Sequence, residues 1–126
     1  MNEQTNKFIL DLSYSFALKI VAFAEVMEQS RDFEEEGQLF KSGTSIGARI
    51  REAQASESME GFLYNLSCAV IEAEETETRL RQYRNSGVYP DTTNLLNDIL
   101  VMKRFLKDII DTTRRKQLQN EKLANM

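Results

Sequence analysis

Three residues near the middle of the chain are the best candidates for chemistry: Cys68, Glu72 and Glu75, which follow one another at helical spacing. Paired carboxylates inside a helical bundle are typical of di-iron sites, but those sites also need Glu-x-x-His motifs, and the chain has no histidine. The absence of histidine also removes the commonest general base. Cys68 is the single cysteine, so it is expected to be a small packing residue. We therefore predict no enzyme activity, no metal ligand and no cofactor.

The two glutamates are better explained by ion pairing. Glu75 and Arg79 lie four residues apart, which is the spacing of an ordinary ion pair on one helix. Glu72 could meet Arg49 or Arg51 of a neighbouring helix or subunit. The sequence therefore predicts a structural role for both carboxylates.

A segment rich in glycine and hydroxyl residues, 38–55, is the second unusual feature. Gly43 and Gly47 lie four apart and share a helix face, although each glycine inside a helix costs about 1 kcal/mol relative to alanine. The usual compensation is a close approach of two helix backbones. A phosphate-binding P-loop is excluded, because it needs four residues between its glycines and then lysine, whereas three residues separate these glycines and Ala48 follows.

Basic residues are the remaining candidates for binding. The chain has 16 Lys and Arg against 20 Asp and Glu, and this net charge of -4 argues against nucleic-acid binding driven by total charge. Residues 102–116 are nevertheless rich in basic side chains, and several identical subunits would multiply that patch into a basic ring. For one chain alone, a solvated helix face is the commoner explanation. The predicted nucleic-acid-binding residues are Lys41, Arg49, Arg51, Arg104, Lys107, Arg114 and Arg115.

The mode of binding expected for these residues is contact with the phosphate backbone. The predicted outer face of the last helix shows no interleaved aromatic side chains of the kind that read single-stranded bases. Sequence-independent contact with RNA or DNA is therefore the expected mode.

Apolar residues recur every three or four positions throughout the chain, which predicts helices and no strands. The prediction is a single domain over residues 1–126 with helices near 7–29, 33–55, 57–84 and 92–116. Asp32 with Glu35 is expected to cap the second helix, Ser56 or Ser58 to cap the third, and residues 120–126 to fray. Short connections favour an all-α, antiparallel up-down four-helix bundle, and the sustained spacing favours left-handed crossing.

The first predicted helix has two apolar stripes, whereas packing in a four-helix bundle needs only one. Its main stripe contains Phe16 and Ile20, and a second stripe lies about half a turn away. A deep position inside the bundle could hide both stripes, but four helices offer few neighbours, so the pattern favours self-association. The predicted subunit-interface residues are Leu10, Tyr14, Ala17, Val21, Ala24, Gly43, Thr44, Gly47 and Ala48.

Residues 38–53 resemble the signature Q-L-x-x-S-G-x-S-I-x-x-N-I-x-E-A of small bacterial four-helix-bundle proteins, also called rRNA intervening-sequence proteins. Arg49 stands where that signature has asparagine, and Thr78 and Arg79 replace an aromatic pair in a second block. The resemblance covers residues 8–110, including an opening Ser-Tyr-x-Phe-Ala-Leu. The matching residues of the two blocks are Gln38, Leu39, Ser42, Gly43, Ser45, Ile46, Ile50, Glu52, Ala53, Glu72, Ala73, Glu75, Thr76 and Leu80.

This resemblance implies an up-down bundle that assembles as a ring-like homopentamer, and it implies little about activity. A fold relative, the accessory protein of diversity-generating retroelements, is a pentamer that binds nucleic acid and a reverse transcriptase, which supports a hypothesis only by analogy. We hypothesise a non-enzymatic pentameric scaffold that binds RNA, DNA or a nucleic-acid enzyme. The alternative is a protein-interaction module with no nucleic-acid role.

The expected location is the cytoplasm. The first residues, MNEQTNK, are polar and unlike a signal peptide, and the apolar runs fall far below the ~20 residues that a membrane helix needs. No membrane partner is expected.

Overall fold

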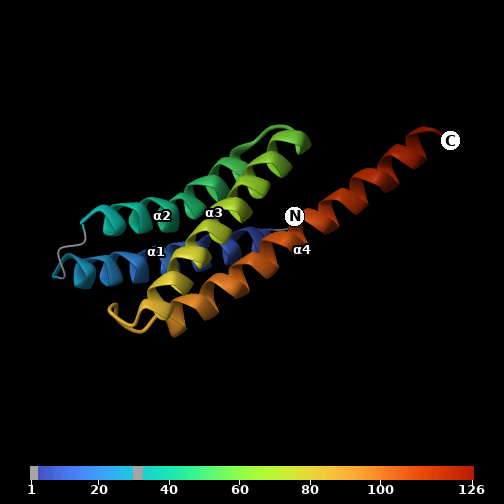
Figure 1. The fold of residues 1–126 in the computed structure, drawn as a ribbon. Helices are drawn as coiled ribbons and strands as arrows, with labels where there is room; N and C mark the ends of the chain where they lie inside the picture. The colour runs from blue at the N-terminus through green and yellow to red at the C-terminus, as the bar shows by residue number, and fades with distance from the viewer. Residues whose placement is uncertain (1–2, 30–32) are drawn as a thin grey trace.

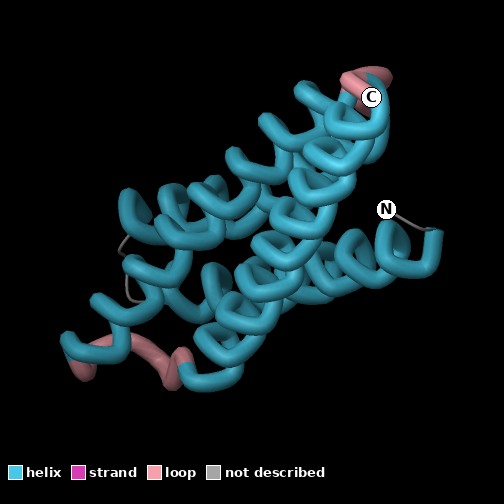
Figure 2. Tube along the Cα trace, turned by 90° about the vertical axis from the view of Figure 1, so that its right-hand side faces the viewer, coloured by secondary structure: helices cyan, strands magenta, loops and turns pink. Residues whose placement is uncertain are grey.

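A computed structural model describes residues 3–29 and 33–126 of the chain. The four helices are α1 (Glu3–Gln29), α2 (Phe33–Ala55), α3 (Met59–Ser86) and α4 (Thr93–Ala124) (Figure 1). Within these described residues the tube in Figure 2 contains helices and loops but no strand. The predicted all-α helical bundle is confirmed. The proposed cap at Asp32 lies outside the described residues.

Local chemistry explains where α3 begins and ends. The hydroxyl of Ser58 accepts a hydrogen bond from the backbone N–H of Gly61 at 3.0 Å, so Ser58 is the N-cap. Gly87 follows the helix with a φ of 74°, a left-handed conformation that glycine adopts without a steric penalty. Beyond the loop, the buried hydroxyl of Thr92 donates to the carbonyl of Leu80 at 3.3 Å, which ties the start of α4 to the end of α3.

The last helix is longer than the sequence pattern predicts. It continues to Ala124, so the expected end near residue 116 is wrong. Of residues 120–126, which were expected to fray, only Asn125 and Met126 lie outside the helix. The extension, residues 117–124, is rich in Gln, Leu, Glu, Lys and Ala, which are good helix formers even without an apolar stripe. After Thr113 no residue of α4 is buried, and its end projects past the other helices (Figure 1).

Neighbours in the chain are neighbours in the bundle. Contacts join α1 to α2, α2 to α3, α3 to α4 and α4 to α1, whereas the diagonal pairs do not meet in the described part of the chain. Paired residues run in opposite order: Phe8 meets Phe105, and Lys19 meets Asp98. Figure 1 shows the chain reversing direction at each connection. Left-handed crossing stays a prediction.

The core is formed by one stripe from each helix, including Phe16 of α1, Leu39 of α2, Leu66 of α3 and Ile99 of α4, all nearly inaccessible. Three buried hydroxyls are satisfied inside their own helices. Those of Ser13, Ser42 and Thr76 donate to backbone carbonyls three or four residues earlier, at 2.7, 3.3 and 2.8 Å. These three side chains therefore lie in the core with their hydroxyls paired.

The two glycines of α2 lie against α1. A Cβ added at Gly43 would lie 2.9 Å from Cγ1 of Ile20, and one added at Gly47 would lie 3.3 Å from Oγ of Ser13. Only a residue without a side chain allows so close an approach at Gly43. This is the close helix contact that the glycine spacing predicts, and it lies within one chain.

Candidate nucleic-acid and subunit interfaces

An apolar surface extends along the outer flank of α1 beside α2. Tyr14 is 64% exposed, and its stripe neighbours Leu10, Ala17 and Val21 are half-buried. On the neighbouring helix, α2 contributes Phe40, which is 47% exposed. The other members are the half-buried Thr44 and Ala48 and the exposed Leu18. We call these eight residues the α1/α2 face.

Three predicted interface residues lie elsewhere. Ala24, Gly43 and Gly47 are buried within the chain, the two glycines against α1, and they are therefore unavailable for a contact between subunits. A side-chain nitrogen of Arg51 lies 3.7 Å from the position of a Cβ on Gly47, so this arginine borders the α1/α2 face. The sequence pattern assigned Arg51 to nucleic acid, and its position makes it also a candidate for the rim of a subunit contact.

The paired carboxylates and Cys68 lie near the middle of α3. Glu72 is half-buried and Glu75 exposed, and in residues 3–29 and 33–126 no three potential metal-ligating side chains of His, Cys, Asp or Glu gather together. Cys68 is half-buried with a free thiol. In the described part of the chain, the structure therefore gives no geometric support for metal binding or catalysis at Cys68, Glu72 and Glu75.

Two of the arginines predicted to pair with Glu72 and Glu75 form their ion pairs with other glutamates. Arg79 pairs with Glu35 of α2 at 2.8 Å rather than with Glu75. The hydroxyl of Tyr83 donates to the same Glu35 oxygen at 2.7 Å, and burial together with this hydrogen bond raises the pKa of Tyr83. Arg49 pairs with Glu52 of its own helix at 3.4 Å. Arg79 and Tyr83 therefore join the start of α2 to the end of α3.

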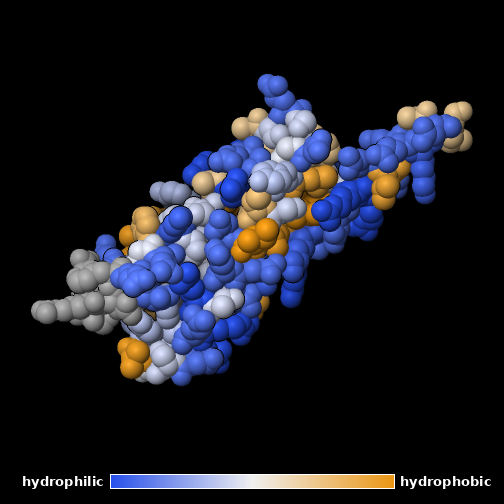
Figure 3. All heavy atoms as spheres, turned by 45° about the horizontal axis from the view of Figure 1, so that its top comes forward, coloured by the Kyte–Doolittle hydropathy of each residue, from blue (hydrophilic) through white to orange (hydrophobic). Residues whose placement is uncertain are grey.

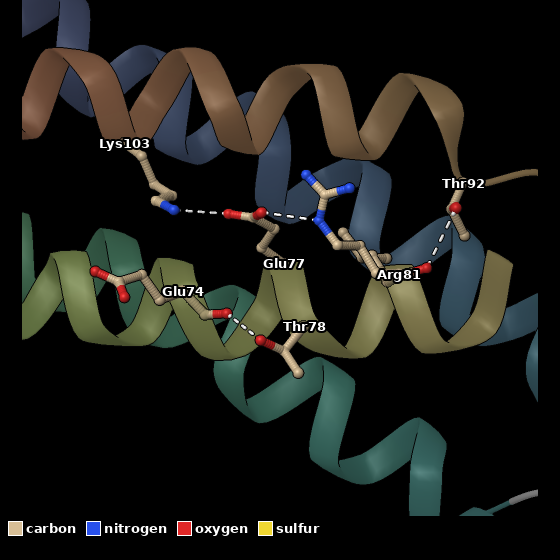
Figure 4. Close-up of polar contacts among 7 residues, drawn as sticks. Glu74, Glu77, Thr78, Arg81, Thr92 and Lys103 are labelled. Carbon is tan, nitrogen blue, oxygen red and sulfur yellow. Dashed lines mark hydrogen bonds and ion pairs between the residues drawn. The ribbon is translucent and has the colours of Figure 1, made fainter. Parts of the chain in front are cut away.

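Sequence reasoning missed an ion-pair network at Glu77, which Figure 4 shows between α3 and α4. Lys103 of α4 donates to one carboxylate oxygen at 2.7 Å, and Nε of Arg81 donates to the other at 2.9 Å. The hydrogen bond from Lys103 is the main cause that lowers the pKa of Glu77, and burial opposes it. Lys103 is thus structural. The Glu77–Arg81 spacing could have signalled half of this network.

We predict that Glu77→Gln lowers the free energy of unfolding by about 1.5–3 kcal/mol, the range for hydrogen bonds to charged groups. Because the pKa of Glu77 is lower in the folded state, its contribution is present above the unfolded glutamate pKa of about 4.3 and is lost as pH falls through the folded value. Urea denaturation between pH 7 and pH 3 measures both effects.

Glu52→Gln is the matched control, because Glu52 is 59% exposed and forms a longer pair. Its expected change is below about 0.5 kcal/mol. Equal effects of the two substitutions would contradict a stabilising network at Glu77.

The predicted basic residues fall on two separate surfaces. Arg104, Lys107, Arg114 and Arg115 are exposed on the outer side of α4, and we call them the α4 basic stripe. Lys41 is exposed on α2, which does not contact α4 in the described residues. One chain therefore does not bring the two groups into a single site. The α4 basic stripe is the larger cluster, although Asp108 and Asp111 are exposed beside it.

A shallow groove runs beside this stripe, between α3 and α4. Its floor includes Val70 and Ile110, its rim carries Lys107 and Arg114, and Ile71 of α3 projects beside them with 61% of its surface exposed. Ser67 and Asp111 complete the lining. Ile71 is a residue that sequence reasoning missed. Its only signal is an apolar side chain outside the regular stripe of α3.

Comparison with known proteins identifies the family. A model of the 23S rRNA-intervening sequence protein family matches residues 6–119. The chain belongs to this family. The family model covers all four helices and ends within the projecting part of α4, so the shared region includes both the α1/α2 face and the α4 basic stripe.

A solved structure supports the same assignment. It is the crystal structure of a protein with unknown function from the S23 ribosomal protein family of Bacteroides thetaiotaomicron VPI-5482. The two chains are 31% identical with a TM-score of 0.80, over 85% of this chain and 98% of the other. The search of curated proteins returned no match. In the described residues, no helix has the length and apolar character required to cross a bilayer.

Proposed function

We propose that this protein is a non-enzymatic, cytoplasmic, homo-oligomeric scaffold that binds nucleic acid through phosphate contacts. The subunit number we propose is five, which is what the resemblance to bacterial intervening-sequence proteins implies. Membership of the 23S rRNA-intervening sequence protein family supports the link to nucleic acid. An assembly module without nucleic-acid binding is the competing outcome of the tests below.

The observation that carries the proposal is the α1/α2 face. Tyr14, Leu18 and Phe40 are each about half exposed or more, and Leu10, Ala17 and Val21 connect them. A contiguous apolar surface of this kind marks a protein interface, because covering a large apolar side chain is worth about 1.5–3 kcal/mol. Figure 3 shows one face of the molecule, on which apolar patches interrupt a mostly hydrophilic exterior.

Assembly would strengthen the weak binding expected of one basic stripe. Four cations of α4 are offset by two neighbouring acids, so a single chain offers only a modest positive surface. When several copies engage one polyanion, later contacts become intramolecular, and affinity rises by avidity. Binding of this type depends steeply on salt because counterions are released from the phosphates.

We predict that Tyr14→Glu separates the oligomer into single chains. The carboxylate would have to lose its water in an apolar contact, whereas the free chain tolerates it because Tyr14 is exposed. Light scattering coupled to size exclusion measures the mass. Tyr64→Glu is the matched control, since Tyr64 is 63% exposed but lies on α3, away from the α1/α2 face. An unchanged mass for Tyr14→Glu would place the interface elsewhere.

A further inference from the structure

We propose that the nucleic acid bound by the α4 basic stripe is single-stranded, with its bases stacking on Tyr64 and packing against Ile71 of α3. This inference rests on the proposed function and specifies its ligand. The outer face of α4 by itself predicts contact with phosphates alone. The neighbouring helix α3 adds exposed side chains, Tyr64 and Ile71, that could contact bases.

The groove between α3 and α4 joins cations to exposed apolar surface. Lys107 and Arg114 stand on its rim, and both line the same depression as Ile71 and Ile110. Ile110 is buried and forms part of the floor, whereas Ile71 is 61% exposed. The α4 side of the groove can therefore meet phosphates, while Ile71 on the α3 side offers apolar surface to an uncharged group.

Tyr64 extends this surface along α3. It precedes Ile71 by seven residues, which is two helical turns, so the two side chains share a face. Tyr64 is 63% exposed, and α3 and α4 are neighbours in the bundle. The outer α3 face thus presents an aromatic ring two helical turns from Ile71, and Ile71 itself lines the groove with the two cations.

Charge complementarity decides the occupant. Two cations against one acid, Asp111, leave the lining of the groove net positive, and the whole α4 basic stripe has four cations against two acids, which suits the phosphates of a polyanion. Glu74 and Glu75 are exposed on the other side of Ile71, so the phosphates should lie on the α4 side of the groove. An aromatic platform beside a cationic groove is how proteins bind single strands without sequence preference, and one stacked base changes affinity about 5- to 100-fold. A duplex keeps its base faces inside the helical stack, so it could use the cations but not Tyr64. The groove therefore favours a single strand over a duplex.

The chain contains no tryptophan, so Tyr64→Trp introduces a single fluorescent reporter at the proposed platform. The probes are an oligothymidylate of about 20 nucleotides, which is longer than typical single-strand sites of about 4–16 nucleotides, and a duplex of about 20 base pairs. Both are added to the full chain at low salt. We expect the single strand to quench the indole emission and the duplex to leave it unchanged. Val88→Trp is the control, since Val88 is 77% exposed in the loop after α3 and lies outside both the groove and the α1/α2 face, and no quenching is expected there.

Fluorescence anisotropy with labelled strands gives the affinities. Tyr64→Ala should weaken binding of the single strand about 5- to 100-fold and change duplex binding by less than about twofold, and Tyr64→Phe, which keeps the ring, should restore single-strand binding. Equal affinity for both probes with unchanged indole emission would overturn stacking at Tyr64 but leave phosphate binding in place. Absence of binding to either probe at low salt would overturn both proposals together.

Discussion

Gly43→Leu should lower the free energy of unfolding by about 1–3 kcal/mol or more, since about 1–3 kcal/mol is the usual cost of overpacking a core. Even a Cβ at this position would lie 2.9 Å from the branched side chain of Ile20, and Ile20 is fully buried, so it has no free space into which it can move. Leucine adds three more carbon atoms at the same point, and α1 and α2 would have to separate. Urea denaturation at fixed protein concentration measures the loss, since assembly makes apparent stability depend on concentration.

Gly37→Leu is the control for this experiment. Gly37 is in the same helix, but nothing lies within 4 Å of a Cβ placed there. Leucine should be neutral or stabilising at that site by up to about 1 kcal/mol, because it is the better helix former. Native stability of Gly43→Leu would contradict the close α1–α2 contact.

The second large effect is expected on nucleic-acid affinity. Replacing Arg104, Lys107, Arg114 and Arg115 together with glutamine should weaken binding about 100-fold or more at low salt, since each position removes one candidate phosphate contact. The slope of log affinity against log salt should fall by about 3, at roughly 0.7 for each contact with a single strand. The exposure of all four side chains means that folding should be preserved.

The control removes positive charge elsewhere. Lys7 and Lys122 are exposed and lie outside the α4 basic stripe, so the double glutamine variant should change affinity several-fold at most. Circular dichroism and native mass establish that both variants fold and assemble. Undiminished binding by the fourfold variant would show that the α4 basic stripe is not the site.

Periodicity was enough to predict the helices because each helix buries one regular apolar stripe. Gly43 and Gly47 likewise predicted a close helix approach, since glycine in a helix needs compensation of that kind. The length of α4 could not be predicted from the same signal. Its last turns bury nothing, and they are helical because of residue propensity alone.

Side-chain partners across helices were harder to predict than the helices themselves. Arg79 has a plausible partner four residues away in Glu75, but the structure pairs it with Glu35, because the N-terminal part of α2 packs beside the end of α3. Ile71 and Lys107 are 36 positions apart in the sequence and meet only because α3 and α4 are adjacent. The spacing of residues in the sequence predicts which side chains can pair within one helix. It does not predict how two helices are aligned along each other, which decides the pairs between helices.

The native mass of the unmodified protein tests the central claim most directly. The claim is that the α1/α2 face of one chain is covered by identical chains, and that the proposed binding depends on this assembly. Light scattering under native conditions should give about five times the 14.6 kDa mass of one chain. A folded species of 14.6 kDa at high concentration would contradict self-association.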